Sequence, residues 1–173
     1  MQEPICNQTK IPREQWRYGL LSSAKGGCGW IAAYNVMVLT GRHVDIPDLI
    51  QKFLLHYPVL NGVAGTAPDA PARILRGFGY RTHSTVDPKQ FDDLGKAADA
   101  GIFYYFWREG FRIGVHFAAV QYRDGEFWGY NFFRNVDTPY RIGKSLSDFI
   151  RRQGFFCVIF TGIWKRQLPN QEG

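Results

Sequence analysis

One segment of this chain is predicted to form a helix that is apolar on nearly every side. It runs from Cys28 to about Thr40 without a charged residue, and Gly41 ends it. A helix that is hydrophobic all round is buried rather than laid on a surface. The other elements of the chain therefore have to surround this helix, and its N-terminal end can still reach a cleft.

Cys28 lies where a glycine-rich turn enters that helix. Gly26 and Gly27 precede it and Gly29 follows, and glycines allow a substrate or a second backbone to come close to the sulfur. The unpaired N–H groups and the dipole of a helix N-terminus favour a thiolate and lower the pKa of a thiol from ~8.5 to ~3.5–7.5. Cys28 is therefore a candidate nucleophile. The alternative is a buried cysteine that packs as a small hydrophobe.

A nucleophilic cysteine needs a base, and His116 stands out among the four histidines. It lies in 113–122, a run that is apolar on both alternating faces and predicts a strand covered on both sides. An imidazole in such a strand needs a polar partner. The other three are expected at the surface or already hydrogen-bonded: His43, His56 and His83.

The strand of His116 leads into Asp124-Gly125, a dipeptide that predicts a hairpin with a two-residue loop. The second strand, at about 127–133, then pairs so that His116 faces Phe133, with Asn131 as the diagonal neighbour on the same face. In that register the side-chain oxygen of Asn131 accepts from Nδ1–H of His116 and leaves Nε2 free to take a proton from a thiol. A loop of odd length turns Asn131 to the opposite face.

Taken in this order, Cys28, His116 and Asn131 resemble the catalytic residues of the papain-like cysteine peptidases. The chain is most similar to the compact bacterial C39-like group, related to the peptidase domains of bacteriocin exporters. The likeness lies in the Cys-Gly at the helix start, the aromatic and small apolar residues after His116, and the polar residue near the end of the next strand. It extends over roughly 20–164. The resemblance implies a thiol protease with Cys28 as nucleophile, His116 as general base and Asn131 as orienting group, working without a cofactor or metal.

The chain departs from the family where a side chain helps to hold the oxyanion. The family carries a glutamine shortly before the cysteine, and Ser22 takes that position here. The resemblance leaves Ser22, Ser23 or an upstream Gln15 as the donor, beside the backbone N–H of Cys28. Loss of one good donor costs ~10²–10³ in turnover.

The periodic and capping patterns predict an α+β domain, with helices on one side of a mainly antiparallel sheet. We expect a single domain over 1–173, with short polar tails at about 1–12 and 166–173. Helices are expected from about 45 to 56, 66 to 77, 87 to 98 and 144 to 153, and strands at 101–107, 113–122, 127–133 and 155–164.

Composition supports a catalytic domain of ordinary size that lies in the cytoplasm. The 173 residues are 45% hydrophobic, enough for a sizeable core. The first dozen residues do not resemble a secretory signal, and the longest apolar run, 155–164, is too short to span a membrane. Three cysteines without a Cys-x-x-Cys predict neither a disulfide framework nor a zinc site. We expect Cys6 in a polar tail and Cys157 in the core.

Three interpretations of function remain open at this stage. The first is a thiol hydrolase, a cysteine peptidase that cleaves a peptide or another acyl or amide substrate through an acyl-enzyme. The second is an acyltransferase or amidase with the same triad, and the third is a catalytically inactive binding module. The net charge of +6 is dispersed, which argues against a nucleic-acid partner. The oligomeric state does not follow from the sequence.

Overall fold

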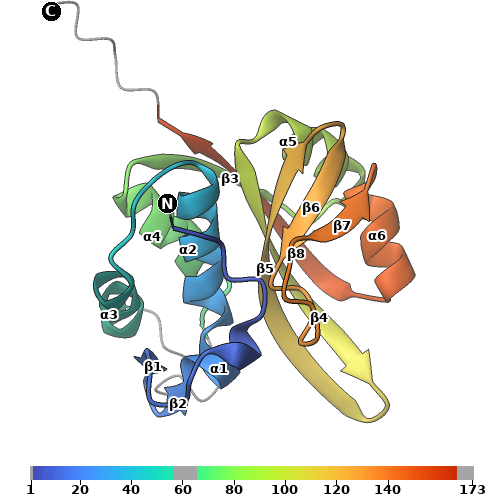
Figure 1. Cartoon of the computed structure of the whole chain (residues 1–173). Coiled ribbons are helices and arrows are strands. Elements are labelled where there is room, and N and C mark those ends of the chain that lie inside the picture. The colour runs from blue at the N-terminus through green and yellow to red at the C-terminus, as the bar shows by residue number, and fades with distance from the viewer. Residues whose placement is uncertain (1, 57–65, 167–173) are drawn as a thin grey trace, which may run out of the picture.

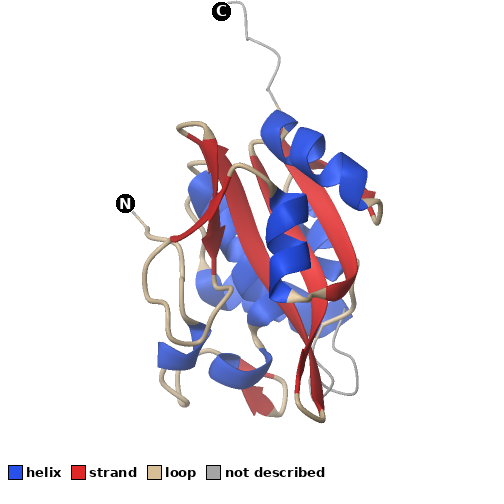
Figure 2. Cartoon of the chain, turned by 90° about the vertical axis from the view of Figure 1, so that its right-hand side faces the viewer, coloured by secondary structure: helices blue, strands red, loops and turns tan. Residues whose placement is uncertain are grey.

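Six antiparallel strands form the sheet around which the chain is built, in a computed structural model that describes residues 2–56 and 66–166. The spatial order is β3-β8-β4-β5-β6-β7 (Figure 1). The strands are β3 (Tyr80–Thr85), β4 (Ala100–Glu109), β5 (Arg112–Arg123), β6 (Glu126–Tyr130), β7 (Tyr140–Gly143) and β8 (Phe156–Lys165). Helices cover both faces, as Figure 2 shows. The predicted α+β class with a mainly antiparallel sheet is confirmed, although helices lie on both sides of the sheet.

The helix that begins at Cys28 lies at the centre of the first core. This helix, α2 (Cys28–Leu39), is buried from its first residue to Met37. It packs on β5 and β4 on one side and on α3 (Ile46–His56) and α4 (Ala70–Gly77) on the other. A short helix, α1 (Ser23–Gly26), precedes it. The predicted central and buried position of this helix is therefore confirmed.

A second core lies on the opposite face of the sheet and is built of aromatic rings. Two helices cover it, α5 (Phe91–Ala97) and α6 (Leu146–Gln153), with the short 3-10 helix η3 (Pro88–Gln90) before α5. Ser145 caps α6, since its hydroxyl accepts from the Asp148 N–H at 3.1 Å. The rings packed between these helices and the sheet include Phe91, Phe103, Phe127, Phe149 and Phe160.

The hairpin between β5 and β6 has the predicted register but a shorter second strand. Asp124 and Gly125 both have positive φ, at 52° and 80°, the conformation of a two-residue turn, and Ala119 pairs with Tyr130. Strand β6 ends there, because Asn131 has φ 63° and leaves the extended conformation. The prediction of a strand to residue 133, with His116 opposite Phe133, is wrong. The half of β5 that carries His116 therefore has no neighbour on the β6 side in the described ladder.

The N-terminal residues pack more closely than a polar tail would. Cys6 and Ile11 are buried, on either side of the 3-10 helix η1 (Gln8–Lys10). Two short strands, β1 (Arg17–Tyr18) and β2 (Leu21–Ser22), follow. Cys6, expected in a polar tail, is instead part of the first core.

Cys157 also differs from its prediction, because it is exposed at the beginning of β8. Strand β3 pairs with β8 only from Phe160 onward, so one edge of β8 is uncovered at Cys157. His43 and His83 lie at the surface as expected, whereas the side chain of His56 lies outside the described residues. Within the described part of the chain, no helix has the length and apolar character needed to cross a membrane.

Two glycine-to-alanine substitutions test this packing. A Cβ at Gly101 lies 2.5 Å from the buried Phe160 ring, whereas a Cβ at Gly77, the last residue of α4, meets nothing within 4 Å. Gly101→Ala is expected to lower the free energy of unfolding by ~1–3 kcal/mol through overpacking. Gly77→Ala is expected to raise it by ~0.4–1 kcal/mol. Denaturant unfolding measures both, and equal effects would contradict the described contact between β4 and β8.

Candidate active site

Cys28, His116 and Asn131 line one cavity of about 900 Å³. Each comes from a different element: Cys28 begins α2, His116 lies in the half of β5 beyond its pairing with β6, and Asn131 follows β6. The structure therefore brings together all three residues of the predicted triad, although not in the predicted arrangement.

The Cys28 thiol is enclosed, with 7% of the residue exposed. Backbone N–H groups of Phe117 in β5 and of Gly29 and Cys28 at the helix start stabilise its thiolate form. Burial acts more strongly in the opposite direction, so the pKa of the Cys28 thiol is raised above its ordinary value. The predicted lowering of this pKa is wrong, because the enclosed thiol is shielded from water.

The His116 ring is fixed by a backbone group. Its Nε2 lies 2.5 Å from the carbonyl oxygen of Asn131. Because a carbonyl only accepts, Nε2 carries the hydrogen in the neutral ring and Nδ1 keeps the free lone pair. The prediction assigned these two nitrogens the other way round. Burial, with a smaller effect of the Arg134 charge, lowers the pKa of His116 to about 4, so the ring is neutral at pH 7.

The Asn131 side chain bonds to Gln8 instead of to His116. Its Oδ1 accepts from the Gln8 backbone N–H at 3.0 Å, and its Nδ2 donates to Gln8 Oε1 at 2.9 Å. Gln8 Nε2 in turn donates to the Ala24 carbonyl in α1 at 3.2 Å. We call the paired amides of Gln8 and Asn131 the amide clamp. The clamp holds the Asn131 backbone, and with it the carbonyl that fixes His116, against the helix that precedes Cys28.

Gln8 has no counterpart among the residues predicted from the sequence. It is buried, yet it lies in a polar N-terminal stretch and in a helix of only three residues. No periodicity, capping pattern or motif identifies such a position. Its partner is 123 residues away in the sequence, so only the folded chain reveals it.

The three predicted oxyanion donors occupy different environments. Ser22 is half-buried and lines the cavity. Ser23 is fully buried, where its hydroxyl donates to the Trp16 carbonyl and accepts from Trp30 Nε1. Gln15 is exposed and is not part of the cavity wall. Of the three, only Ser22 has a place in this site.

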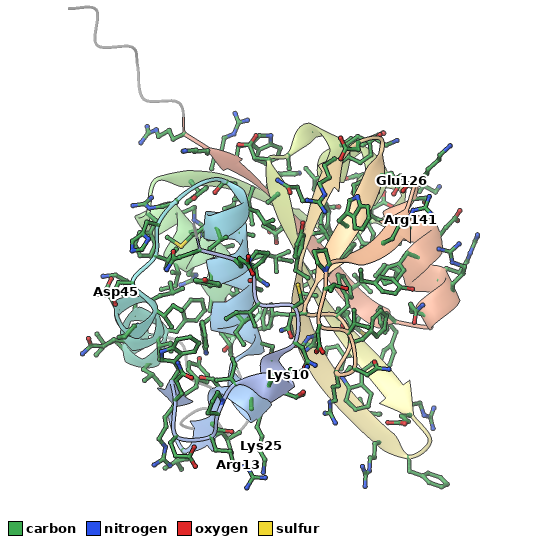
Figure 3. All side chains as sticks on the ribbon, viewed as in Figure 1. Lys10, Arg13, Lys25, Asp45, Glu126 and Arg141 are labelled. Atoms are coloured by element: carbon green, nitrogen blue, oxygen red, sulfur yellow. The ribbon has the colours of Figure 1, made fainter. Side chains whose placement is uncertain are left out.

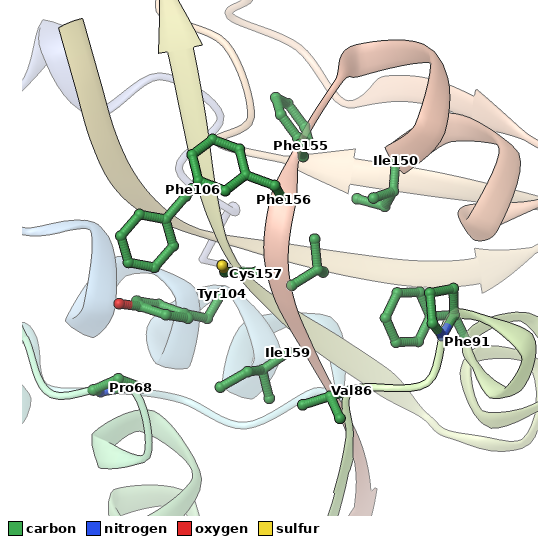
Figure 4. A pocket seen from close by; sticks show the side chains of 12 residues that line it. Pro68, Val86, Phe91, Tyr104, Phe106, Ile150, Phe155, Phe156, Cys157 and Ile159 are labelled. Atoms are coloured by element: carbon green, nitrogen blue, oxygen red, sulfur yellow. The ribbon is translucent and has the colours of Figure 1, made fainter.

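A second cavity of about 650 Å³ lies beside the beginning of β8. Figure 4 shows the rings of Phe106 and Phe156 together near Cys157 and Tyr104. Among the described residues that line this second cavity there is no histidine and no carboxylate, whereas His116 lines the cavity of Cys28. Among the described residues there is also no group of three metal-binding side chains.

Comparison with known proteins identifies the fold. No family model matches the sequence, and no curated protein matches it either. Among solved structures, the chain is similar to the peptidase domain of Streptococcus ComA, which is described as a bi-functional ABC transporter involved in quorum sensing. The TM-score is 0.56 at 16% identity, over 80% of this chain and 91% of that chain. The similarity confirms the predicted C39-like, papain-like peptidase fold.

The amide clamp can be tested by replacing Gln with Leu separately at two positions, one inside the clamp and one outside it. Gln8→Leu leaves Asn131 Nδ2 without its acceptor in a buried place, and we expect the free energy of unfolding to fall by ~1–3 kcal/mol. Gln15→Leu makes the same change at an exposed position, where a change within ~0.5 kcal/mol is expected. Denaturant unfolding of both variants gives the comparison. Equal stabilities would show that the Gln8 bonds contribute nothing to the fold.

Proposed function

We propose that this protein is a thiol hydrolase, a cysteine peptidase that works through an acyl-enzyme. The proposal rests mainly on one observation: an enclosed thiol and an imidazole of fixed orientation line the same cavity. The likeness in fold to a peptidase domain supports it. In the proposed roles, Cys28 is the nucleophile and His116 the general base. Asn131 orients His116 through its backbone carbonyl.

The reaction begins with proton transfer from the Cys28 thiol to Nδ1 of His116. Both groups are neutral at rest, because burial raises the pKa of the thiol and lowers the pKa of the imidazole. The sulfur then attacks the substrate carbonyl carbon, the C–N bond breaks, and Nδ1 returns the proton to the leaving amine. Water, deprotonated by the same nitrogen, hydrolyses the thioester and regenerates the thiol.

The negative charge of the tetrahedral intermediate needs hydrogen-bond donors. We assign the backbone N–H of Cys28 and the hydroxyl of Ser22 to this role. Ser22 is the candidate because it lines the cavity and makes no capping bond to α1. Such donors act strongly in a site that excludes water.

The free edge of β5 favours a peptide as substrate. In an antiparallel ladder, successive residues direct their backbone groups alternately to the two sides. Arg123 and Glu126 pair beside the turn, so the backbone groups of Arg123 are directed to β6. Ala119 lies an even number of residues before Arg123, and its backbone groups are therefore directed to β6 as well. The same alternation directs Val115 and Phe117 to this side, where β6 has already ended. The N–H of Phe117 is engaged with the Cys28 sulfur, whereas Val115 lines the cavity. An extended peptide can pair with the backbone groups of Val115 as an added strand.

A covalent probe tests the assignment of the nucleophile. A peptide with an electrophilic carbonyl replacement is expected to form an adduct at Cys28, located by mass mapping, and Cys28→Ala is expected to abolish both adduct and hydrolysis. His116→Gln should lower turnover by ~10²–10⁴ while the domain stays folded. Cys157→Ser, at the exposed cysteine, is the control and should retain activity. Hydrolysis by a folded Cys28→Ala protein would overturn the proposal, and product that forms only with an added amine would assign acyl transfer instead.

The pH dependence tests the state of His116. The general base has to be unprotonated, and burial lowers its pKa to about 4. As the pH falls, the unprotonated and active form therefore persists through the pH range in which histidines ordinarily become protonated, and it is lost only near pH 4. We expect the acidic limb of kcat/KM there, provided that circular dichroism shows the protein still folded. A limb near ~6.5, the ordinary histidine value, would contradict the buried environment of this ring.

A further inference from the structure

The cavity that contains Cys28 and His116 has a cationic rim. Three of its lining residues are basic, Arg13, Lys25 and Arg134, and one is acidic, Glu109. All four are exposed at their outer ends, and none belongs to an ion pair within the described part of the chain. Figure 3 shows Arg13 and Lys25 at the same end of the molecule as Lys10.

One acidic side chain that contacts the cavity-lining residue Asn7 is already engaged. Asp137 forms an ion pair with Lys10 and accepts a hydrogen bond from Asn7 Nδ2 at 2.7 Å. Its charge is therefore compensated outside the cavity wall. The positive charges of Arg13, Lys25 and Arg134 thus remain available to a ligand.

The basic side chains come from both sides of the candidate catalytic groups. Lys25 belongs to α1, directly before the helix of Cys28. Arg134 follows Asn131, and its charge is felt at the His116 ring. Cations therefore accompany both the nucleophile and the base.

The sheet side of the same cavity is mainly aromatic, with the acidic Glu109 at the end of β4. Tyr105 is fully buried and stacks on Phe132 and Phe155, with ring centroids 5.8 Å and 4.1 Å away. A substrate in the cavity therefore meets apolar rings on one wall and cations on the other. The rings on this wall are Tyr105, Trp107, Phe132, Phe133 and Phe155.

We propose that this site selects peptide substrates that carry a carboxylate within about two residues of the scissile bond, a distance that extended chain covers in ~7 Å. The inference rests on the proposed function, because it names the substrate class of the same site. A single exposed cation attracts an anion weakly in water. Several cations of one sign around a concave wall act together, since the field concentrates there and raises the local concentration of anions.

Matched peptides test the preference directly. The test compares peptides that carry Glu, Gln or Lys at one of the two positions before, or one of the two positions after, a single scissile bond. Every peptide is made with a free and with an amidated C-terminus. At low salt we expect kcat/KM to be at least about tenfold higher for Glu than for Gln. The preference should fall between ~0.1 M and ~1 M salt, as the screening length shortens. If only peptides with a free C-terminus are preferred, the recognised carboxylate is that of the chain end. If neither Glu over Gln nor the free over the amidated C-terminus is preferred, the inference is overturned.

Charge reversal locates the effect on the rim. Arg13→Glu, Lys25→Glu and Arg134→Glu should each reduce the ratio of Glu to Gln peptide turnover, and the triple variant should favour Lys. Lys89→Glu makes the same change at an exposed residue of η3 that does not line the cavity, and it should leave the ratio unchanged. If the Glu to Gln ratio changed equally in the three single rim variants and in Lys89→Glu, the assignment to this rim would be overturned.

A binding measurement separates this inference from the proposed function. The Cys28→Ala variant has no nucleophile, and the anisotropy of labelled Glu and Gln peptides reports its affinity for each. If the Cys28→Ala variant binds the Glu peptide more tightly and the natural protein hydrolyses neither peptide, the cationic site is supported and the peptidase assignment is defeated. Equal hydrolysis and equal binding of both peptides would defeat the cationic site and leave the peptidase assignment intact.

Discussion

The rest of the structure depends on one constraint, which is that α2 has no polar face. A helix with apolar side chains on every side has to be covered on every side, so β4 and β5 pack on one flank and α3 and α4 on the other. Only the first residue of α2, Cys28, borders the cavity beside the sheet. The requirement that buries the helix thus also determines where the thiol of Cys28 reaches the cavity.

This burial has an electrostatic cost at the site. Backbone N–H groups around the sulfur favour a thiolate, yet desolvation raises the pKa of Cys28 and lowers the pKa of His116. The two groups therefore rest as neutral partners rather than as an ion pair. An enclosed neutral thiol is less open to adventitious oxidation than a thiolate.

Local rules predicted those parts of the molecule that are set by neighbours in sequence. The apolar pattern gave the extent of α2, and the Asp124-Gly125 turn gave the register of the β5–β6 hairpin. They failed at Asn131, because its positive φ follows from contacts with the N-terminal residues rather than from its own neighbours. Gln8 was missed for the same reason. The sequence therefore named three residues that line one cavity, Cys28, His116 and Asn131, while the orientation of His116 required the three-dimensional contacts.

The amide clamp also has a consequence for the order of events during synthesis. Gln8 leaves the ribosome early, but its partner Asn131 is made 123 residues later, and contacts of such long range close late in folding. Until they close, the carbonyl of Asn131 has no support and the imidazole of His116 has no fixed direction. On the proposed mechanism, a chain in which the segments of Gln8 and Asn131 have not yet met carries a thiol without an oriented base.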